Sequence, residues 1–560
     1  MIDRVIRNWQ EWKNEELEDI DLINELLNID KSEEEISERF YRDLEFGTGG
    51  LRGVIGVGTN RMNIYTVAKA CQGHSNYLNK YNVSPTVAIA YDSRVKSEIF
   101  AKRAAEVYAA NGIKAFIYSE LMPTPSLSFA VRELKCSAGI VVTASHNPSK
   151  YNGYKVYGSD GCQITTEAAE EILNEINKLH IFRDVKKVSF DNAVLQNKIT
   201  YIDEVVVKKY INNVSIQSLC DKDINKDFTI VYTPLNGTGL KCVKTALVNN
   251  GFTNLIIVKE QEKPDGNFPT CPYPNPEIRE ALELGIRCAK AVGGGLLLAT
   301  DPDCDRVGIA IRHNQEYVLL SGNEVGMLLF DYICKRRIEL GLMPENPILI
   351  KTIVTIDMVD KIAKYYGVKV IDVLTGFKFI GEQIGKLEAK GEIERYIFGF
   401  EESYGYLTGT YVRDKDAVNA SLMICEMFAY YKSQGKSLID ELNNLYKQFG
   451  FCQNTLHSYV FEGIKGFEKM QYIMKDFRNN PMNKLAGKKI IKINDYLEGI
   501  NDLPKSDVLK YIFEDNMSMV IRPSGTEPKI KLYLSISGEN SDITSKIESS
   551  IIDEITKIML

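Results

Sequence analysis

Thr143-Ala144-Ser145-His146-Asn147-Pro148 follows a short apolar run, Ala138–Val142, and the rest of the chain is organised around this stretch. The apolar run predicts a buried β-strand, and the turn-forming residues after it predict the loop at the end of that strand. Ligands usually bind at this place in an α/β sheet. A serine hydroxyl here can carry a phosphoryl group between two ends of a substrate if charge is neutralised around it. An ordinary turn is the alternative interpretation.

A second polar loop, Asp301-Pro302-Asp303-Cys304-Asp305-Arg306, follows another apolar run, Leu296–Ala299. Three carboxylates at alternate positions can converge on one hard divalent cation and leave coordination places for waters and a phosphate oxygen. An EF-hand is excluded, because the sixth and twelfth positions of the loop are Arg306 and Arg312 rather than Gly and Glu. The pattern therefore predicts a metal site made by Asp301, Asp303 and Asp305.

These two loops, together with Gly399–Gly405 (GFEESYG) and Arg522–Lys529 (RPSGTEPK), occur in an order that resembles the α-D-phosphohexomutase superfamily. Its members move a phosphate between the 1 and 6 (or 5) positions of a sugar. The resemblance covers nearly the whole chain and includes the long branch that contains phosphopentomutase-type enzymes. It implies an α/β fold in which three similar mixed-sheet α/β/α domains are followed by a smaller α+β C-terminal domain around a central cleft.

We expect an N-terminal helical extension at residues 1–45 and four domains after it. Domain 1, at 46–210, carries the phosphoserine loop, and domain 2, at 211–322, carries the metal loop. Domain 3, at 323–450, carries the sugar loop, and domain 4, at 451–560, carries the phosphate loop.

Local patterns agree with this order of domains. A strand at Thr86–Tyr91 followed by a helix at Ser97–Asn111 gives the βα rhythm of a mainly parallel sheet. From Phe451 onward the pattern indicates shorter strands, and it ends in a helix at Ser541–Met559.

The resemblance also implies roles for individual residues. Ser145 becomes a phosphoserine, and Mg²⁺ held by the three aspartates also contacts its phosphoryl oxygens, with a sugar 1,6-bisphosphate as activator. Arg52 and Lys155 are implied active-site cations. We interpret His146 as a phosphate contact or loop brace rather than a general base. The implied substrate-binding residues are Arg306, Thr375, Gly376, Glu401, Ser403, Lys415, Arg522, Ser524, Gly525, Thr526 and Lys529.

The expected activity is that of an isomerase acting on glucose 1-phosphate, because Glu401-Glu402-Ser403 resembles the glucose-preferring pattern. Mannose and pentose 1-phosphates remain open, since the phosphate loop is closer to the phosphomannomutase form. A phosphatase is a rival class, but the D-x-D-x-T motif is absent because Cys304-Asp305 follow Asp303. A non-catalytic sugar-phosphate sensor is a third class, and it would lack Ser145 or a metal carboxylate.

Composition limits the partners. The 560 residues carry a net charge of −7, which argues against nucleic acid and anionic membranes as general partners. The 11 cysteines are scattered singly without a C-x-x-C pair, so reduced thiols in the cytoplasm are expected. Residues 1–18 lack a signal-peptide core, and no run of about 18 apolar residues occurs. We expect small sugar phosphates as partners and a monomer or homodimer.

Overall fold

A computed structural model describes residues 2–29, 32–47, 49–221, 223–461, 463–500, 503–524 and 529–559. The chain divides into two compact units. Unit 1 contains Met1–Ser218, Asn225–Leu320 and Gly405–Glu426, and unit 2 contains Leu219–Ile224, Ser321–Tyr404 and Met427–Leu560. Each unit is described by itself below.

Unit 1 opens with three helices, α1 (Ile2–Asn14), α2 (Ile20–Ile29) and α3 (Glu33–Phe40). They pack onto the first sheet domain through Trp12, which is 1% exposed. Its ring centroid lies 6.0 Å from that of Phe40, 5.4 Å from that of Tyr65 and 5.2 Å from that of Phe182, in edge-to-face arrangements that aromatic pairs favour.

The first sheet of unit 1 has the strand order β1-β5-β4-β2-β3-β6. Its strands are β1 (Gly50–Val54), β2 (Thr86–Tyr91), β3 (Lys114–Ile117), β4 (Ala138–Val142), β5 (Tyr151–Gly158) and β6 (Ile199–Tyr201). Strand β4 pairs in parallel with β2 and antiparallel with β5, so the sheet is mixed. All five residues of β4 are apolar or glycine and buried, as expected of a central strand covered on both faces.

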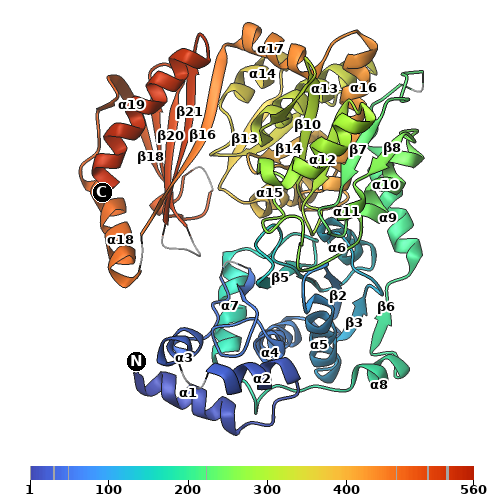
Figure 1. The fold of residues 1–560 in the computed structure, drawn as a ribbon, viewed down its shortest axis with the longest axis vertical. Helices are drawn as coiled ribbons and strands as arrows, with labels where there is room; N and C mark the ends of the chain where they lie inside the picture. Colours follow the sequence, from blue (N-terminus) through green and yellow to red (C-terminus); the bar gives the residue numbers. More distant parts are fainter. Residues whose placement is uncertain are drawn as a thin grey trace. The chain divides into compact units, whose positions relative to one another are not determined.

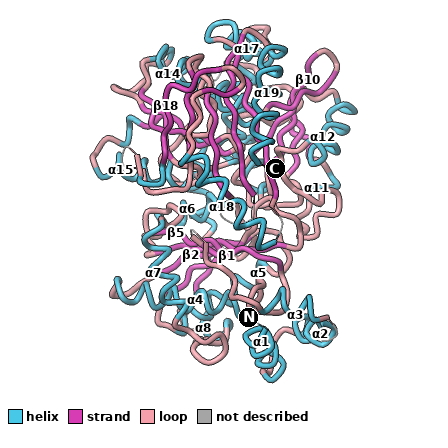
Figure 2. The backbone as a smooth tube through the Cα atoms, turned by 90° about the vertical axis from the view of Figure 1, so that its left-hand side faces the viewer, coloured by secondary structure: helices cyan, strands magenta, loops and turns pink. Residues whose placement is uncertain are grey.

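Helices cover both faces of this sheet, with α6 above it and α4 and α7 below it in Figure 2. The helices are α4 (Ile64–Tyr81), α5 (Ser97–Ala110), α6 (Thr124–Glu133), α7 (Thr166–Asn177), α8 (Phe190–Leu195) and α9 (Glu204–Ile216). Asn63 begins α4 through a reciprocal capping box with Thr66. Pro125, in the first turn of α6, has no backbone N–H to leave unsatisfied there.

The second sheet of unit 1 has the order β11-β10-β9-β7-β8. Its strands are β7 (Ile230–Thr233), β8 (Leu255–Ile257), β9 (Leu296–Thr300), β10 (Val307–His313) and β11 (Glu316–Leu320), and its helices are α10 (Gly239–Asn249), α11 (Lys259–Glu262) and α12 (Arg279–Val292). Strand β7 runs parallel to β9, whereas β9 and β10 form an antiparallel hairpin. The segment 405–426 adds β15 (Gly405–Leu407) and the start of α16 (Ala417–Ser433) to unit 1.

Unit 2 contains a third sheet in which β12 (Ile348–Thr352) lies between β13 (Lys369–Val373) and β14 (Tyr396–Glu401), all parallel. Its helices are α13 (Gly322–Glu339), α14 (Met358–Tyr366), α15 (Phe377–Ala389), η1 (Ile393–Arg395) and α17 (Leu438–Phe449). Ser437 caps α17 through a capping box with Asp440.

The last sheet of unit 2 is antiparallel, in the order β16-β21-β20-β19-β18-β17. Its strands are β16 (Phe451–Val460), β17 (Lys484–Leu485), β18 (Lys488–Asp495), β19 (Leu509–Phe513), β20 (Ser518–Pro523) and β21 (Lys529–Gly538), and its helices are α18 (Gly463–Asn479), η2 (Tyr496–Glu498) and α19 (Ser541–Met559). Helices α18 and α19 pack against this sheet (Figure 1). The expectation of shorter strands here is wrong, because β16 and β21 pair along 10 residues each.

The predicted fold class is confirmed: three mixed or parallel sheets with helices are followed by an antiparallel sheet with helices. Among the described helices, none is long and apolar enough to cross a membrane. The 11 cysteines, all within the described residues, are free thiols.

Candidate active site and metal centre

Ser145 lies in the loop after β4, as the sequence predicts, and is 4% exposed. Its backbone is left-handed, with φ of 51°, which is uncommon outside glycine. The Ser145 amide donates to Thr143 Oγ1 at 2.8 Å, and the Asn147 amide donates to the Ala144 carbonyl at 3.1 Å. The Ser145 hydroxyl donates to Asp301 Oδ2 at 2.7 Å, so the serine faces the loop that carries the carboxylates.

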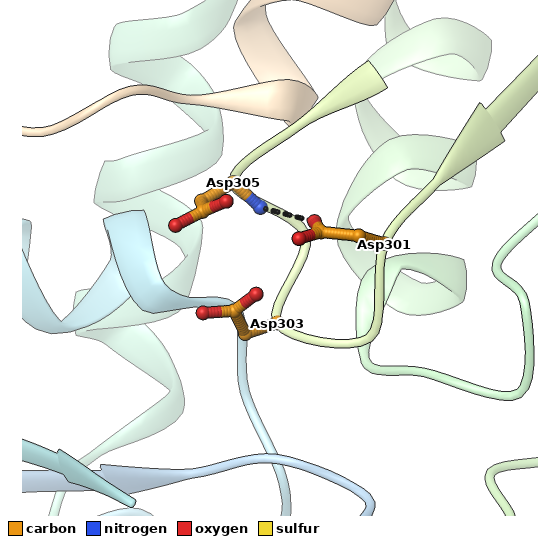
Figure 3. Close-up of side chains that lie close together, drawn as sticks. All are labelled: Asp301, Asp303 and Asp305. Atoms are coloured by element: carbon orange, nitrogen blue, oxygen red, sulfur yellow. Dashed lines mark hydrogen bonds between the residues drawn. The ribbon is translucent and has the colours of Figure 1, made fainter. Parts of the chain in front are cut away.

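Asp301, Asp303 and Asp305 come from the turn between β9 and β10 and point toward one another (Figure 3). One carboxylate oxygen from each lies within 4.8 Å of the others. The backbone amide of Asp305 donates to Asp301 Oδ1 at 3.1 Å, and that of Arg306 donates to the same oxygen at 3.0 Å. The turn therefore folds around the Asp301 carboxylate, and one carboxylate oxygen of each of the other two aspartates lies near it.

The donor set fits a hard divalent cation. All three aspartates are at most 1% exposed, and Asp303 Oδ1 and Asp305 Oδ1 have no hydrogen-bond partner within the described part of the chain. Buried carboxylate oxygens without donors are costly unless a cation satisfies them. Burial, together with the charges of Asp305 and Asp303, raises the pKa of Asp301 well above its usual range. A bound cation would relieve that mutual repulsion.

Two lysines contact the carboxylates from other segments of unit 1. Lys155 Nζ, on β5, lies 3.0 Å from Asp303 Oδ2, and Lys415 Nζ lies 3.0 Å from Asp305 Oδ2. Burial alone would raise the pKa of Asp303, but the ammonium groups of Lys155 and Lys415 hold it below its usual range. Lys415 also contacts Asp414 Oδ1 at 3.3 Å, and the Tyr157 hydroxyl donates to Asp414 Oδ2 at 2.7 Å. The metal loop thus has cations on two sides.

Three further predicted residues lie around Ser145. His146 Nδ1 is 3.2 Å from Ser145 Oγ, so these adjacent side chains converge. Burial, with the charges of Arg306 and Arg52, lowers the pKa of His146 well below its usual range. Arg52, on β1, donates to Asn147 Oδ1 at 3.4 Å. Arg306 pairs with Glu277 Oε1 at 2.8 Å and lies 3.8 Å from Asp305 Oδ1.

Thr124 contacts the metal loop, although sequence reasoning gave it no role. It begins α6, and its amide donates to the Asp303 carbonyl at 2.8 Å while its hydroxyl donates to Asp303 Oδ2 at 3.0 Å. The positive end of the helix and Lys155 therefore act on one carboxylate. Pro123 and Pro125 on either side signal a helix start in the sequence, but the partner lies 179 residues away.

The candidate sugar residues lie in unit 2. Glu401 ends β14 and is 4% exposed, and Ser403 follows in the next turn. Glu402, to which sequence reasoning gave no role, accepts from the Thr352 hydroxyl at 3.1 Å. Burial and the charge of Glu401 raise the pKa of Glu402 to about 7. Thr375 Oγ1 has no hydrogen-bond partner within the described ranges, and Gly376, with φ of 120°, leads into α15.

The candidate phosphate residues also lie in unit 2. Arg522, on β20, donates to the Tyr533 hydroxyl at 3.3 Å. The amide of Ser524 donates to the carbonyl of Lys529 at 2.7 Å, which closes the ends of the loop. Gly525 and Thr526 lie outside the described residues.

Family models match three successive parts of the chain. They are those of phosphoglucomutase/phosphomannomutase, alpha/beta/alpha domain I at residues 43–181, domain II at 208–314 and domain III at 321–449. The chain belongs to the phosphoglucomutase/phosphomannomutase family. The resemblance inferred from the four loops is thereby confirmed.

Curated relatives in the phosphoglucomutase/phosphomannomutase family match over nearly the full length. A phosphoglucomutase of Staphylococcus saprophyticus is 37% identical over 551 residues, which is 95% of this chain and 98% of the relative. A phosphoglucomutase of Staphylococcus aureus strain USA300 is 38% identical over 538 residues, which is 93% of this chain and 95% of the relative.

Solved structures show the same fold. Parafusin (phosphoglucomutase) from Paramecium, in its open form, has a TM-score of 0.69 and 20% identity, and the match covers 92% of this chain and 95% of that one. A phosphoglucomutase/phosphomannomutase family protein from Burkholderia thailandensis has a TM-score of 0.65 and 18% identity over 92% of this chain and 97% of that one.

Proposed function

We propose that the protein is a phosphoglucomutase, an isomerase that interconverts glucose 1-phosphate and glucose 6-phosphate through a phosphoserine enzyme and a sugar 1,6-bisphosphate. The observation that carries the proposal is the Ser145 hydroxyl, which donates at 2.7 Å to one of three buried carboxylates. The full-length likeness to phosphoglucomutases at 37% identity supports the reaction class.

Asp301, Asp303 and Asp305 would hold the metal, for which we propose Mg²⁺, and the phosphorylated Ser145 would be its further ligand. When bound, a divalent cation supplies positive charge that stabilises the charge developing on the transferring phosphoryl group. Lys155 contacts Asp303 and Lys415 contacts Asp305, each at 3.0 Å, and these contacts fix the orientation of the two carboxylates.

In the proposed cycle the phosphoserine gives its phosphoryl group to the free hydroxyl of the sugar phosphate. The bond from phosphorus to Ser145 Oγ breaks as a bond to the sugar oxygen forms. The sugar hydroxyl gives up its proton and Ser145 Oγ gains one, so the step leaves a bisphosphate and a free serine hydroxyl. The bisphosphate turns over and returns its other phosphoryl group to Ser145 Oγ. Arg52, Lys155 and Arg306 neutralise the equatorial oxygens, and positioning and electrostatics supply most of the acceleration. His146, 3.2 Å from Ser145 Oγ, braces the loop or contacts the phosphate.

The residues of unit 2 would bind the remainder of the substrate. Glu401 accepts from sugar hydroxyls and Ser403 donates to or accepts from them. Thr375, whose hydroxyl has no hydrogen-bond partner within the described ranges, and Gly376 lie in a turn suited to the sugar. Lys415 is a further proposed substrate-binding residue. The phosphate that does not move is held by Arg522, Ser524, Gly525, Thr526 and Lys529.

We favour glucose because the sequence Glu401-Glu402-Ser403 resembles the glucose-preferring pattern and the curated relatives are named phosphoglucomutase. Mannose 1-phosphate is the second candidate, since Arg522–Pro528 (RPSGTEP) resembles the phosphomannomutase form of the phosphate loop.

The same proposal covers the setting of the enzyme. A sugar 1,6-bisphosphate serves as activator by phosphorylating Ser145. The partners are small sugar phosphates rather than nucleic acid or membranes, the protein is a monomer or homodimer, and it works in the cytoplasm. The proposed domain boundaries remain 46–210, 211–322, 323–450 and 451–560.

The test compares mutase rates on glucose, mannose and ribose 1-phosphates, each with Mg²⁺ and a catalytic amount of the matching bisphosphate. We expect glucose 1-phosphate to give the highest kcat/KM, and equal values on all three would overturn the glucose preference. Intact mass spectrometry after incubation with glucose 1,6-bisphosphate tests the mechanism. A protein that never gains a phosphate on Ser145 would refute the mutase.

A further inference from the structure

Arg94 lies beneath the loop that carries Ser145, and its side chain is fully buried. Its two terminal nitrogens donate to three backbone carbonyls of that loop and to the carbonyl of Tyr151, which begins β5. Nη2 donates to the Ser145 carbonyl at 2.5 Å and to that of Asn147, and Nη1 donates to those of Pro148 at 2.9 Å and Tyr151 at 3.0 Å. A guanidinium has four N–H groups on these two nitrogens, so one side chain satisfies four carbonyls.

Arg94 is itself fixed at the end of β2. Asp92 Oδ2 lies 3.5 Å from Arg94 Nε, and Asp92 Oδ1 accepts from the Arg94 amide at 2.9 Å and from the Ser97 hydroxyl at 2.7 Å. Asn152, next to Tyr151, donates to the Ser97 hydroxyl at 3.0 Å. These hydrogen bonds therefore connect the end of β2 with the start of β5. The positive charge of Arg94 is balanced by the buried Asp92 carboxylate.

The segment that follows α11 packs against the guanidinium and the backbone next to it. Arg94 Cζ lies 5.1 Å from the centroid of the Phe268 ring. A Cβ on Gly266 would lie 2.3 Å from the Val95 amide nitrogen, so only glycine allows this close approach. The segment that contains Gly266 and Phe268 thus packs directly against Arg94 and the backbone next to it.

The loop needs such a support because its conformation is strained at Ser145. A left-handed serine costs free energy and persists only where the surroundings determine it. The same backbone aims the Ser145 hydroxyl at Asp301 Oδ2. A displacement of about 1 Å at a reacting atom can cost about 100-fold in rate.

We propose that Arg94 is a positioning residue for phosphoryl transfer: it holds four carbonyls between Ser145 and Tyr151 and so fixes the direction of the Ser145 hydroxyl. Arg94 makes no contact with substrate in this role. The inference rests on the proposed function, because the group that it positions is the proposed phosphate carrier. It assigns a function to Arg94, which lies between the strand predicted at Thr86–Tyr91 and the helix predicted at Ser97–Asn111.

The test uses the full-length protein with Arg94→Lys and with the pair Asp92→Asn/Arg94→Met. A lysine keeps the charge but cannot reach four carbonyls, and the pair removes both charges so that no buried carboxylate is left unpaired. Arg132→Met is the matched control, because Arg132 also donates to a loop carbonyl, that of Asp160 at 2.9 Å, away from Ser145.

We expect kcat and the rate of Ser145 phosphorylation by glucose 1,6-bisphosphate to fall together by about 100-fold in both Arg94 variants, with KM changed less than about threefold. In both Arg94 variants the backbone amides of residues 143–151 should exchange hydrogen faster than in the parent. Arg132→Met should stay within about twofold of the parent in both rates. A purely structural role would lower the active fraction without slowing phosphorylation of the folded protein.

Unchanged phosphorylation and kcat in Arg94→Lys and in the double variant would overturn the inference, as would an equal loss in Arg132→Met. If the double variant does not fold, Arg94→Lys decides. Failure of the proposed function can be told apart from failure of this inference, because the parent protein itself would then take up no phosphate. In that case, faster hydrogen exchange at residues 143–151 in Arg94→Lys but not in Arg132→Met would still support the inference that Arg94 positions the loop. Unchanged exchange in Arg94→Lys would refute it.

Discussion

Ser145 combines a left-handed backbone with a buried hydroxyl that donates to a carboxylate. The backbone turn brings the hydroxyl out of the line of β4, and Asp301 fixes its direction. Because the carboxylate partner is itself held by two backbone amides, the hydroxyl points at a rigid group. This arrangement suits a nucleophile whose oxygen has to return to the same position in every catalytic turnover.

Ser145→Ala should abolish mutase activity, by at least about 1,000-fold in kcat, because no other oxygen can store the phosphoryl group. Intact mass should show no added phosphate after incubation with glucose 1,6-bisphosphate. The far-ultraviolet circular dichroism spectrum should match that of the parent. Ser189→Ala, at an exposed serine, is the control and should keep full activity. Substantial turnover by the alanine variant would remove Ser145 from its proposed role.

His74 gives a pH-dependent contribution to stability. It is 1% exposed, its Nδ1 lies 2.7 Å from the Tyr108 hydroxyl, and burial lowers its pKa to about 3. The unfolded chain takes up the proton below pH 6.5 and the folded one does not, so stability is complete above pH 6.5 and falls toward pH 3. Between pH 6.5 and 5 the loss is about 2 kcal/mol.

His74→Gln checks this contribution, because glutamine is about the same size and does not titrate. The variant is expected to be less stable at pH 7.5 but to lose less stability than the parent between pH 7.5 and 5. Urea unfolding at both pH values measures the difference, and carboxylates that titrate in both proteins cancel. Parallel losses in the two proteins would show that His74 does not carry the effect.

At the scale of elements, continuous apolar runs allowed accurate prediction. Strands β2 and β4 begin and end where their apolar runs do, because both faces of each are buried. The length of strand β16 was underestimated, because two of its exposed positions are the apolar Leu456 and Val460 while most of its polar residues are partly buried, and because its length is set by pairing with β21. Thr124 and Arg94 could not be assigned, because their partners are far away in the sequence or are backbone carbonyls.

The packing of α13 on the sugar loop gives a prediction at this scale. A Cβ on Gly322 would lie 2.1 Å from the Glu402 carbonyl oxygen, which is backbone and cannot move without the loop. Gly322→Ala should therefore lower kcat/KM for glucose 1-phosphate at least about tenfold and destabilise unit 2 by about 1–3 kcal/mol.

Gly385→Ala, inside α15, is the control, because a Cβ there meets no atom within 4 Å. It should leave kcat/KM within about twofold and should not lower Tm. Steady-state kinetics and thermal unfolding measure both variants. An unchanged Gly322→Ala protein would show that the loop tolerates displacement and that its position does not set affinity for the sugar.

For the molecule as a whole, the net charge of −7 means that an anion such as a sugar phosphate is attracted only where positively charged side chains gather. In unit 1, Lys155 and Lys415 contact carboxylates of the metal loop and Arg306 lies close by. Three buried carboxylates and these cations form one network, so a change at any member alters the electrostatic balance of the others. The three carboxylates of this network could hold a metal ion.

Mg²⁺ should therefore stabilise the folded protein as well as support its activity. A cation that binds only the folded state at about 100 times its Kd adds about 2.7 kcal/mol, so Tm should rise with Mg²⁺ concentration. In Asp305→Asn, which loses one negative charge at the site, the rise should be largely absent, and NaCl at equal ionic strength should not reproduce it in either protein. Treatment with a chelator should abolish mutase activity and Mg²⁺ should restore it. If Mg²⁺ raised Tm equally in the parent and in Asp305→Asn, the cation would be bound elsewhere, and the three carboxylates would have to be regarded as a structural cluster balanced by Lys155 and Lys415 alone.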